Sequence, residues 1–109
     1  MNGDQPQGRA RPRVVAVVGA TGAVGREVLK QLHVRRFPVG ELRALASQRS
    51  AGESLAFGDA TVRVQELKDG AEDGVDVAIM AADASTSRQW APRFQAAGAC
   101  VVDNSSAFR

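Results

Sequence analysis

The sequence predicts an α/β fold with a doubly wound, mostly parallel sheet and helices on both of its faces. Short β-branched runs alternate with longer segments of helical periodicity, which is typical of βαβ units. The run VVAVV at 14–18 is continuously apolar, as expected of a central strand that is buried on both faces. A glycine-rich segment at 19–25 joins this run to the first helical pattern. These features predict a strand, a turn and a helix at the start of the domain.

The remaining elements are predicted in chain order. Apolar residues from Val24 to Leu32 recur at helical spacing, and the break at 35–38 ends this first helix. Further strands are expected at 42–46, 55–57, 61–67, 75–80 and 99–103. The last of these strands is an apolar run, so we expect its residue Cys100 to be buried.

A second helix is predicted over 85–97. Ser85 or Thr86 is able to cap its first amides, and Gly98 suits the left-handed position after its last turn. Pro92 lies inside the pattern, and because proline lacks a main-chain N–H we expect the helix to kink or restart there.

Size and composition limit the class of protein. The chain has 109 residues, of which 44% are hydrophobic, enough for one globular domain. Residues 1–12 are almost without apolar side chains, so we expect a disordered tail before a domain at 13–109. The net charge is only +2 and the basic residues are scattered, so no nucleic-acid partner is expected. No apolar run approaches the ~20 residues of a membrane span, and a single cysteine without a secretion signal favours the cytoplasm.

The glycine-rich segment Gly19-Ala-Thr-Gly22-Ala-Val-Gly25 is a variant of the dinucleotide fingerprint and predicts a Rossmann-type domain. Glycine permits the tight turn, the approach of a pyrophosphate to the backbone, and close packing of the helix on the strand. The helix N-terminus then presents free amides to the anion, and the Thr21 hydroxyl adds a donor. The alternative is a tight structural turn without a ligand.

The end of the second predicted strand bears on the choice of cofactor. NAD-binding sites usually place a carboxylate there for the ribose 2′-hydroxyl, but this segment reads Ser47-Gln-Arg49-Ser50 and holds no acid. A guanidinium and hydroxyl groups suit a 2′-phosphate, which favours NADP. The alternative is a solvated polar turn.

Three further residues are candidates for chemistry. Asp83 follows a predicted central strand, where it is either an acceptor for cofactor or substrate or the cap of the next helix. His33 has no second ligand at metal-binding spacing, so we predict a structural role and no metal site. Cys100 is predicted to be structural as well, because a catalytic thiolate needs an accessible, electropositive site.

In order along the chain, VAVVGATGAVG, LASQRSAGESLAF, STSRQWAPRFQAAG and VVDNSSAFR resemble the N-terminal cofactor domain of aspartate-semialdehyde dehydrogenases. The resemblance spans nearly all of 13–109. N-acetyl-gamma-glutamyl-phosphate reductases share the glycine loop but usually carry an aromatic residue where Ala23 stands, and they lack the Arg-Ser block in this form.

The resemblance implies roles for particular residues. Asn104 and Arg109 would line the cleft for aspartyl phosphate or inorganic phosphate. The family reduces L-4-aspartyl phosphate to aspartate semialdehyde through a cysteine thioester and hydride transfer. The implied NADP contacts are Gly19, Thr21, Gly22, Ala23, Val24, Gly25, Arg49 and Ser50.

Two departures from the family pattern stand out. The family typically has Ser-Ala-Gly-Gly-Ser where this chain has Ala81-Ala-Asp83-Ala-Ser85. The family's nucleophilic cysteine and general-base histidine lie beyond Arg109, so we expect no catalysis from these 109 residues alone. We also expect a homo-oligomer or an association with a full-length relative. The alternative function is a non-catalytic NADP-binding or interaction module, a truncated paralogue.

Overall fold

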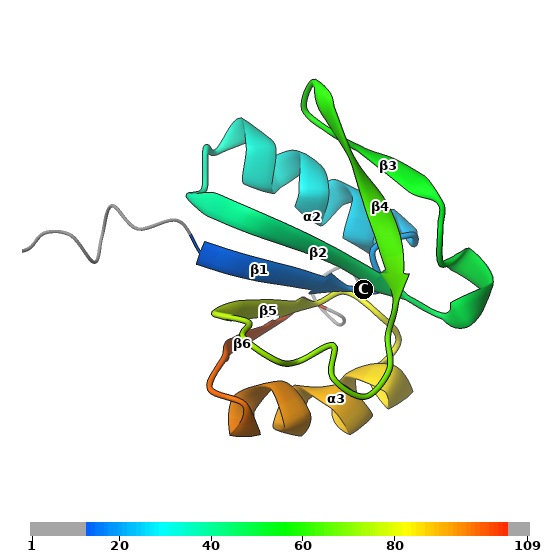
Figure 1. Ribbon diagram of the computed structural model, residues 1–109, viewed down its shortest axis with the longest axis vertical. Coiled ribbons are helices and arrows are strands. Elements are labelled where there is room, and N and C mark those ends of the chain that lie inside the picture. Colours follow the sequence, from blue (N-terminus) through cyan, green and yellow to red (C-terminus); the bar gives the residue numbers. More distant parts are fainter. Residues whose placement is uncertain (1–12, 105–109) are drawn as a thin grey trace, which may run out of the picture.

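The computed structural model describes residues 13–104, and its strands form one sheet in the order β3-β4-β2-β1-β5-β6 (Figure 1). Only the β3–β4 pair is antiparallel; the other neighbouring pairs are parallel. The strand bounds are β1 Arg13–Val18, β2 Val39–Ala46, β3 Ser54–Phe57, β4 Ala60–Glu66, β5 Val77–Met80 and β6 Cys100–Asp103.

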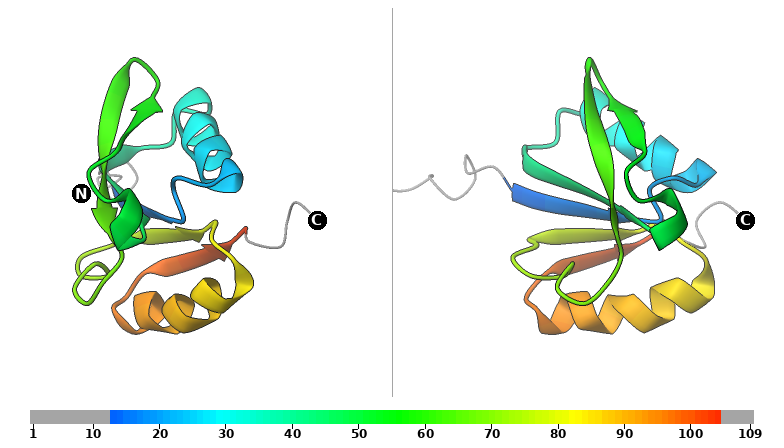
Figure 2. Two further views of the ribbon diagram at one scale, coloured as in Figure 1. Left: turned by 90° about the vertical axis from the view of Figure 1, so that its right-hand side faces the viewer. Right: turned by 45° about the vertical axis from the view of Figure 1, so that its right-hand side comes forward.

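Within the described part of the chain, two α-helices lie on opposite faces of this sheet, which confirms the doubly wound α/β fold (Figures 1 and 2). Helix α2 spans Ala23–Val34, helix α3 spans Ala84–Ala96, and a short 3-10 turn, η1, spans Gln48–Ser50. Each helix covers its own hydrophobic core. Leu29 of α2 and Phe94 of α3 are among the largest fully buried side chains of the two cores.

Strand β1 supplies side chains to both cores because successive strand residues point to opposite faces. Val15 and Val17 pack on the α2 side, whereas Ala16 and Val18 pack on the α3 side. All four are fully buried, so the prediction of a central strand at 14–18 is confirmed.

The chain order of the strands creates a switch point at β1. From β1 the chain moves outward through β2 to β4, then returns to the other side of β1 to form β5 and β6. The loops after β1 and β5 therefore leave the sheet toward opposite helices. In open α/β sheets, the crevice at this point is where ligands bind.

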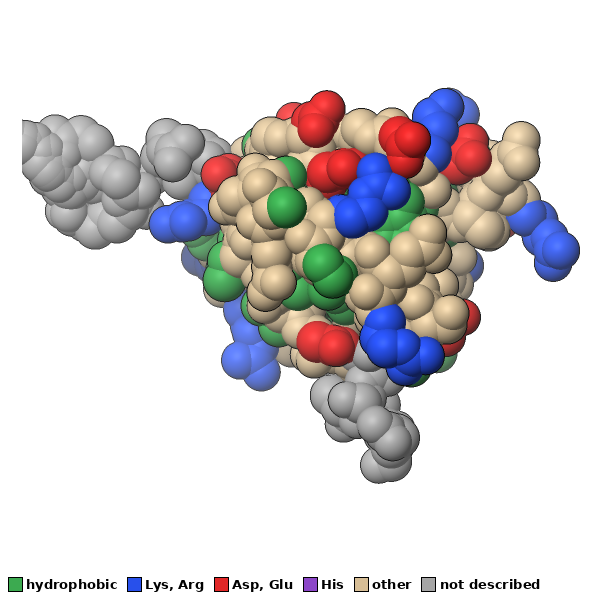
Figure 3. Space-filling view, turned by 90° about the horizontal axis from the view of Figure 1, so that it is seen from below, with side chains coloured by type: hydrophobic (Ala, Val, Ile, Leu, Met, Phe, Trp, Pro, Cys, Tyr) green, Lys and Arg blue, Asp and Glu red, His purple; other side chains and the backbone are tan. Residues whose placement is uncertain are grey.

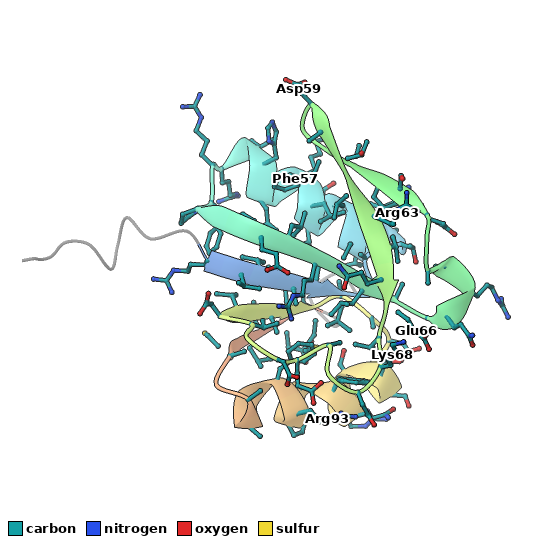
Figure 4. The ribbon with its side chains drawn as sticks, viewed as in Figure 1. Phe57, Asp59, Arg63, Glu66, Lys68 and Arg93 are labelled. Carbon is teal, nitrogen blue, oxygen red and sulfur yellow. The ribbon has the colours of Figure 1, made fainter. Side chains whose placement is uncertain are left out.

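The connection between β4 and β5 contains no helix. Residues 67–76, here called the connector, are held against the sheet and α3 by two arginines. Arg43 donates to the carbonyl oxygens of Ala71 (3.1 Å) and Asp73 (2.6 Å). Arg93 of α3 pairs with Asp69 at 2.9 Å and Glu72 at 3.0 Å. Figure 4 labels Arg93 below the sheet, and in Figure 3 acidic and basic side chains are interspersed on this side of the molecule.

Helix α3 differs from its prediction in two details. It begins at Ala84 and is capped by Asp83, so the prediction of a cap at Ser85 or Thr86 is wrong. It also continues through Pro92 to Ala96 as one helix, so of the two outcomes expected at the proline, a kink or a restart, the restart is wrong. Trp90 and Phe94, on either side of the proline, are both buried against the sheet, and this packing holds the helix together across the lost hydrogen bond. Gly98 has a φ of +102°, as predicted for the position after the last turn.

Cys100 is exposed, so the prediction of a buried cysteine is wrong. The reason is the place of β6 at the sheet edge. Its residue Val101 packs on the α3-side core, and the side chains next to it in the strand point to the opposite face. Val102 on that face is 42% exposed, because α2 lies over β1 and β3 instead.

Candidate functional site

A cavity of about 400 Å³ lies where the carboxyl ends of four strands come together, and we call it the crevice. The ends of β1, β2, β4 and β5 each contribute to its wall, and the first turns of α3 close one side. Its lining residues are Gly19, Thr21, Ala46, Ser47, Leu67, Ala82, Thr86, Gln89 and Trp90.

Gly19 allows the loop after β1 to touch the loop after β5. Its φ is +86°, and a Cβ at this position would lie 2.7 Å from the main-chain N and Cα of Ala82. The amides of Gly19 and Ala20 both donate to the carbonyl oxygen of Leu45, at 2.8 and 3.1 Å. The loop is thus fixed between β2 and β5, and no other residue type fits at Gly19 without displacing the β5 loop.

The other two glycines of the motif have different surroundings. A Cβ at Gly25 would overlap the carbonyl oxygen of Gly19 and would lie 2.6 Å from the Cα of Ala20, so only glycine lets α2 pack this closely on the loop. A Cβ at Gly22 would meet nothing closer than the Gly19 oxygen at 3.7 Å, an ordinary contact. The fold therefore needs glycine at 19 and 25, while Gly22 leaves open space beside the start of α2.

Within residues 13–104, no side chain caps the N-terminus of α2. Gly22 is the N-cap residue, no side chain bonds to the first amides, and the first turn contains no acidic residue. The first hydrogen bond of the helix runs from the Arg26 amide to the Gly22 carbonyl oxygen at 2.9 Å. The amides of Ala23, Val24 and Gly25 therefore have no acceptor within the helix. Such an end binds anions, because the helix dipole adds to the free donors.

The N-terminus of α3 is closed by comparison. Asp83 Oδ1 accepts the Thr86 amide at 2.7 Å. This hydrogen bond lowers the pKa of Asp83 below its ordinary value, with smaller contributions from the Thr86 side chain and from the Arg88 charge. Of the two interpretations of Asp83, the structure therefore shows the cap. The two helices of the described residues thus differ, and α2 is the one whose positive end is left without a protein carboxylate.

Turn η1 follows β2 directly and carries Arg49 and Ser50. The turn is closed by a hydrogen bond from the Ser50 amide to the Ser47 carbonyl oxygen at 3.0 Å. Ser47 lines the crevice, and Arg49 lies two residues further along, on the exposed side of the turn. No acidic residue within 13–104 forms an ion pair with the Arg49 guanidinium.

The structure does not place Asn104 in the crevice. Its amide donates to the Met80 carbonyl oxygen at 2.8 Å, directly after β6. Its side chain lines a separate cavity of about 210 Å³ on the α2 side, beside Glu27 and Ile79. Arg109, the second predicted phosphate contact, lies outside the described residues.

Sequence reasoning missed part of the crevice wall. Thr86, Gln89 and Trp90 recur at i, i+3 and i+4 on α3, a spacing that puts them on one helix face and was visible in the sequence. Leu67 belongs to the connector and had no such signal. Trp90 is only 6% exposed, and the Arg93 guanidinium lies 4.0 Å from the centre of its ring. The connector, α3 and the crevice wall are thus linked through Arg93.

Within residues 13–104, no group of three or more His, Cys, Asp or Glu residues is placed to hold a metal ion. Over the same residues, neither helix has the length and apolar character that a bilayer span requires.

Comparison with known proteins decides the family. Residues 14–109 match the family model described as the semialdehyde dehydrogenase NAD binding domain. The chain belongs to this family. The resemblance to aspartate-semialdehyde dehydrogenases is confirmed by relatives of that name. The chain is 49% identical over 98 residues to the aspartate-semialdehyde dehydrogenase of Synechocystis sp., covering 90% of this chain and 29% of the relative. It is 50% identical over 96 residues to the aspartate-semialdehyde dehydrogenase of Aquifex aeolicus, covering 87% of this chain and 28% of that relative.

Solved structures of the family superimpose on this chain. Aspartate semialdehyde dehydrogenase II of Vibrio cholerae, complexed with ASA, has a TM-score of 0.82 and 44% identity, with 90% of this chain and 32% of that chain covered. The aspartate semialdehyde dehydrogenase of Candida albicans with NADP has a TM-score of 0.63 and 25% identity, with 90% of this chain and 31% of that chain covered. The chain thus spans less than a third of the length of the relatives it matches.

Proposed function

We propose that this chain binds NADP and is the cofactor domain of an aspartate-semialdehyde dehydrogenase. The open N-terminus of α2 beside the crevice carries this proposal. Its free amides and the glycine loop suit a pyrophosphate, since they offer donors and a positive dipole end at which no carboxylate of the described residues acts as a cap. The proposed contacts of this group are Gly19, Thr21, Gly22, Ala23, Val24 and Gly25.

The adenosine half of the cofactor is assigned to the other walls of the crevice. Arg49 and Ser50 would hold the 2′-phosphate, because the turn offers a guanidinium that no described acid neutralises. Ala46, Leu67 and Trp90 give the crevice an apolar side suited to a flat base. The solved relative with NADP supports the choice of this cofactor.

The reaction itself requires more than the described residues supply. When bound, the nicotinamide ring of NADP exchanges a hydride with the substrate carbon. This chain's contribution is to bind and orient the cofactor. Its cysteine, Cys100, lies on the exposed face of β6, and His33 lies against Phe57 of β3 with ring centres 5.7 Å apart. Neither residue lines the crevice, so a thiolate and a general base must come from elsewhere.

We extend the proposal to the whole protein. Reductive dephosphorylation of aspartyl phosphate would take place at a catalytic part outside this chain, with Asn104 and Arg109 at the phosphate. The same proposal includes a small-molecule substrate and a cytoplasmic location. It also includes either a homo-oligomer or an association with a full-length relative. Light scattering on the purified chain, alone and mixed with a full-length relative, tests the association.

Fluorescence offers a direct test of cofactor binding. Trp90 is the chain's one tryptophan and the chain has no tyrosine, so protein emission reports on the crevice wall alone. Titration with NADPH should quench this emission saturably by energy transfer to the reduced nicotinamide, and NADH should bind more weakly. Absence of saturable quenching, together with absence of heat in a calorimetric titration, would contradict the proposal.

A further inference from the structure

Arg26 contacts the glycine loop twice, although the fingerprint motif ends one residue before it. Its main-chain N–H donates to the Gly22 carbonyl oxygen at 2.9 Å. Its side-chain Nε donates to the Thr21 carbonyl oxygen, also at 2.9 Å. One residue in the first turn of α2 therefore binds two consecutive carbonyl groups of the loop.

These contacts fix the orientation of the Thr21–Gly22 peptide. The described residues contain no cis peptide, so the Thr21 carbonyl and the Gly22 N–H point in opposite directions. The carbonyl is held by Arg26, and the N–H donates to the Gly19 carbonyl oxygen at 3.2 Å. The peptide is thus held on both sides. The loop keeps its shape without relying on a ligand.

The position of Arg26 is unfavourable for the helix itself. A cation in the first turn is repelled by the positive end of the helix dipole, and Lys30 one turn later adds a like charge at i+4. Arg26, Lys30 and His33 line a groove between α2 and β3 whose other lining residues are uncharged. Within 13–104 no carboxylate forms an ion pair with Arg26. Its charge is therefore left to act on the anion site.

We propose that Arg26 is a positioning residue for the cofactor phosphates. It holds the Thr21–Gly22 peptide in the anion-binding shape and adds positive charge beside the free amides of α2. The cation destabilises α2 in the free chain and stabilises the chain that holds an anion. This inference rests on the proposed function, and it predicts that removing the Arg26 charge weakens cofactor binding without lowering the stability of the free protein.

The test compares Arg26→Gln with Lys30→Gln. Both changes remove one positive charge from the same groove, but within residues 13–104 only the Arg26 side chain, and not that of Lys30, forms a hydrogen bond with the loop. Arg26→Gln should weaken NADPH binding about 10-fold, as expected for one charge-assisted hydrogen bond, and Lys30→Gln by less than about 2-fold. The unfolding midpoint of free Arg26→Gln should equal or exceed that of the parent. Arg26→Lys should have an intermediate affinity, since it restores the charge but not the planar Nε donor.

Pyrophosphate gives a second probe that does not depend on the identity of the cofactor. It should raise the unfolding midpoint of the parent and of Lys30→Gln more than that of Arg26→Gln. Equal affinities of parent and Arg26→Gln, or a lower midpoint of the free variant together with weaker binding, would overturn the inference. If the parent binds no NADPH, the proposed function fails. In that case the pyrophosphate comparison still decides the role of Arg26, and equal midpoint shifts count against it.

Discussion

The carboxylate of Asp83 accepts a hydrogen bond from the Thr86 amide at 2.7 Å, and this contact closes the N-terminus of α3. The same hydrogen bond lowers the pKa of Asp83 from its ordinary value of 3.8. A carboxyl whose pKa is lower in the folded state stabilises the protein fully above its unfolded pKa. It loses that contribution as the pH falls through its folded value.

This linkage predicts how Asp83→Ala depends on pH. At pH 7 the variant should melt at a lower temperature than the parent, because the Thr86 amide loses its acceptor. The difference between the two melting temperatures should shrink as the pH falls below 3.8, because protonation of Asp83 in the parent then weakens its hydrogen bond to the Thr86 amide. Thermal unfolding followed by circular dichroism across this range checks it. A difference that is constant with pH would show that the ionised cap is not its cause.

Arg49→Ala should change the choice of cofactor. A charge-assisted hydrogen bond contributes roughly 1.5 to 3 kcal/mol, so the variant should bind NADPH roughly 10 to 100 times more weakly and NADH as the parent does. Calorimetric titration with both cofactors measures this preference. Arg63→Ala is the matched control, since Arg63 is an exposed arginine of the hairpin (Figure 4). Equal losses in the two variants would refute a specific phosphate contact.

Gly25→Ala and Gly22→Ala should affect different properties, the first the stability of the free protein and the second its affinity for NADPH. The first places a Cβ 2.6 Å from the Cα of Ala20 and should lower the unfolding midpoint of the free protein. The second makes only a 3.7 Å contact and should leave that midpoint nearly unchanged. It should still weaken NADPH binding, because the methyl group occupies space that the backbone offers to the anion. Normal NADPH affinity in Gly22→Ala would argue against a pyrophosphate at this position.

Cys100 should react in the native protein. The exposed thiol is the chain's single cysteine, so one equivalent of a disulfide reagent should be consumed without denaturant. A thiol that reacts only after unfolding would contradict the exposed edge position.

The chain alone should be inactive. Phosphate-dependent reduction of NADP with aspartate semialdehyde should be undetectable, since neither Cys100 nor His33 lines the crevice. Turnover by a chain of verified mass would contradict the catalytic prediction.

The parts of the fold that sequence predicts well are those encoded locally. The apolar run at 14–18 and the glycine motif identify the first βα unit because both signals lie within a few neighbouring residues. The exposure of Cys100 depends on which strand ends the sheet, and a single strand's pattern does not contain that information. Strand β2 starts at Val39 and not at 42, because its first residues pair with β1 despite being partly exposed.

The candidate site divides in the same way. The open end of α2 follows from the motif, whereas the crevice wall depends on tertiary contacts between distant segments. Leu67 enters the wall because its amide donates to the Ala46 carbonyl oxygen at the end of β2, at 2.7 Å. The cap at Asp83 was one of two local alternatives, and only the hydrogen bond with the Thr86 amide in the folded chain separates them.

The central place of β1 also bears on the order in which the chain folds. Its partners are β2, which follows soon after it, and β5, which lies much further along the chain. Just before β5, the Asp76 side chain accepts a hydrogen bond from the Val14 amide at 2.8 Å, across a separation of 62 residues. Closing that long loop costs more chain entropy than pairing with β2. During synthesis, β1, α2 and β2 can assemble first. The α3 side of β1, with Ala16 and Val18, stays uncovered until α3 has left the ribosome. For that interval a nascent chain carries an exposed apolar strip, the kind of surface that makes partly folded chains prone to aggregation.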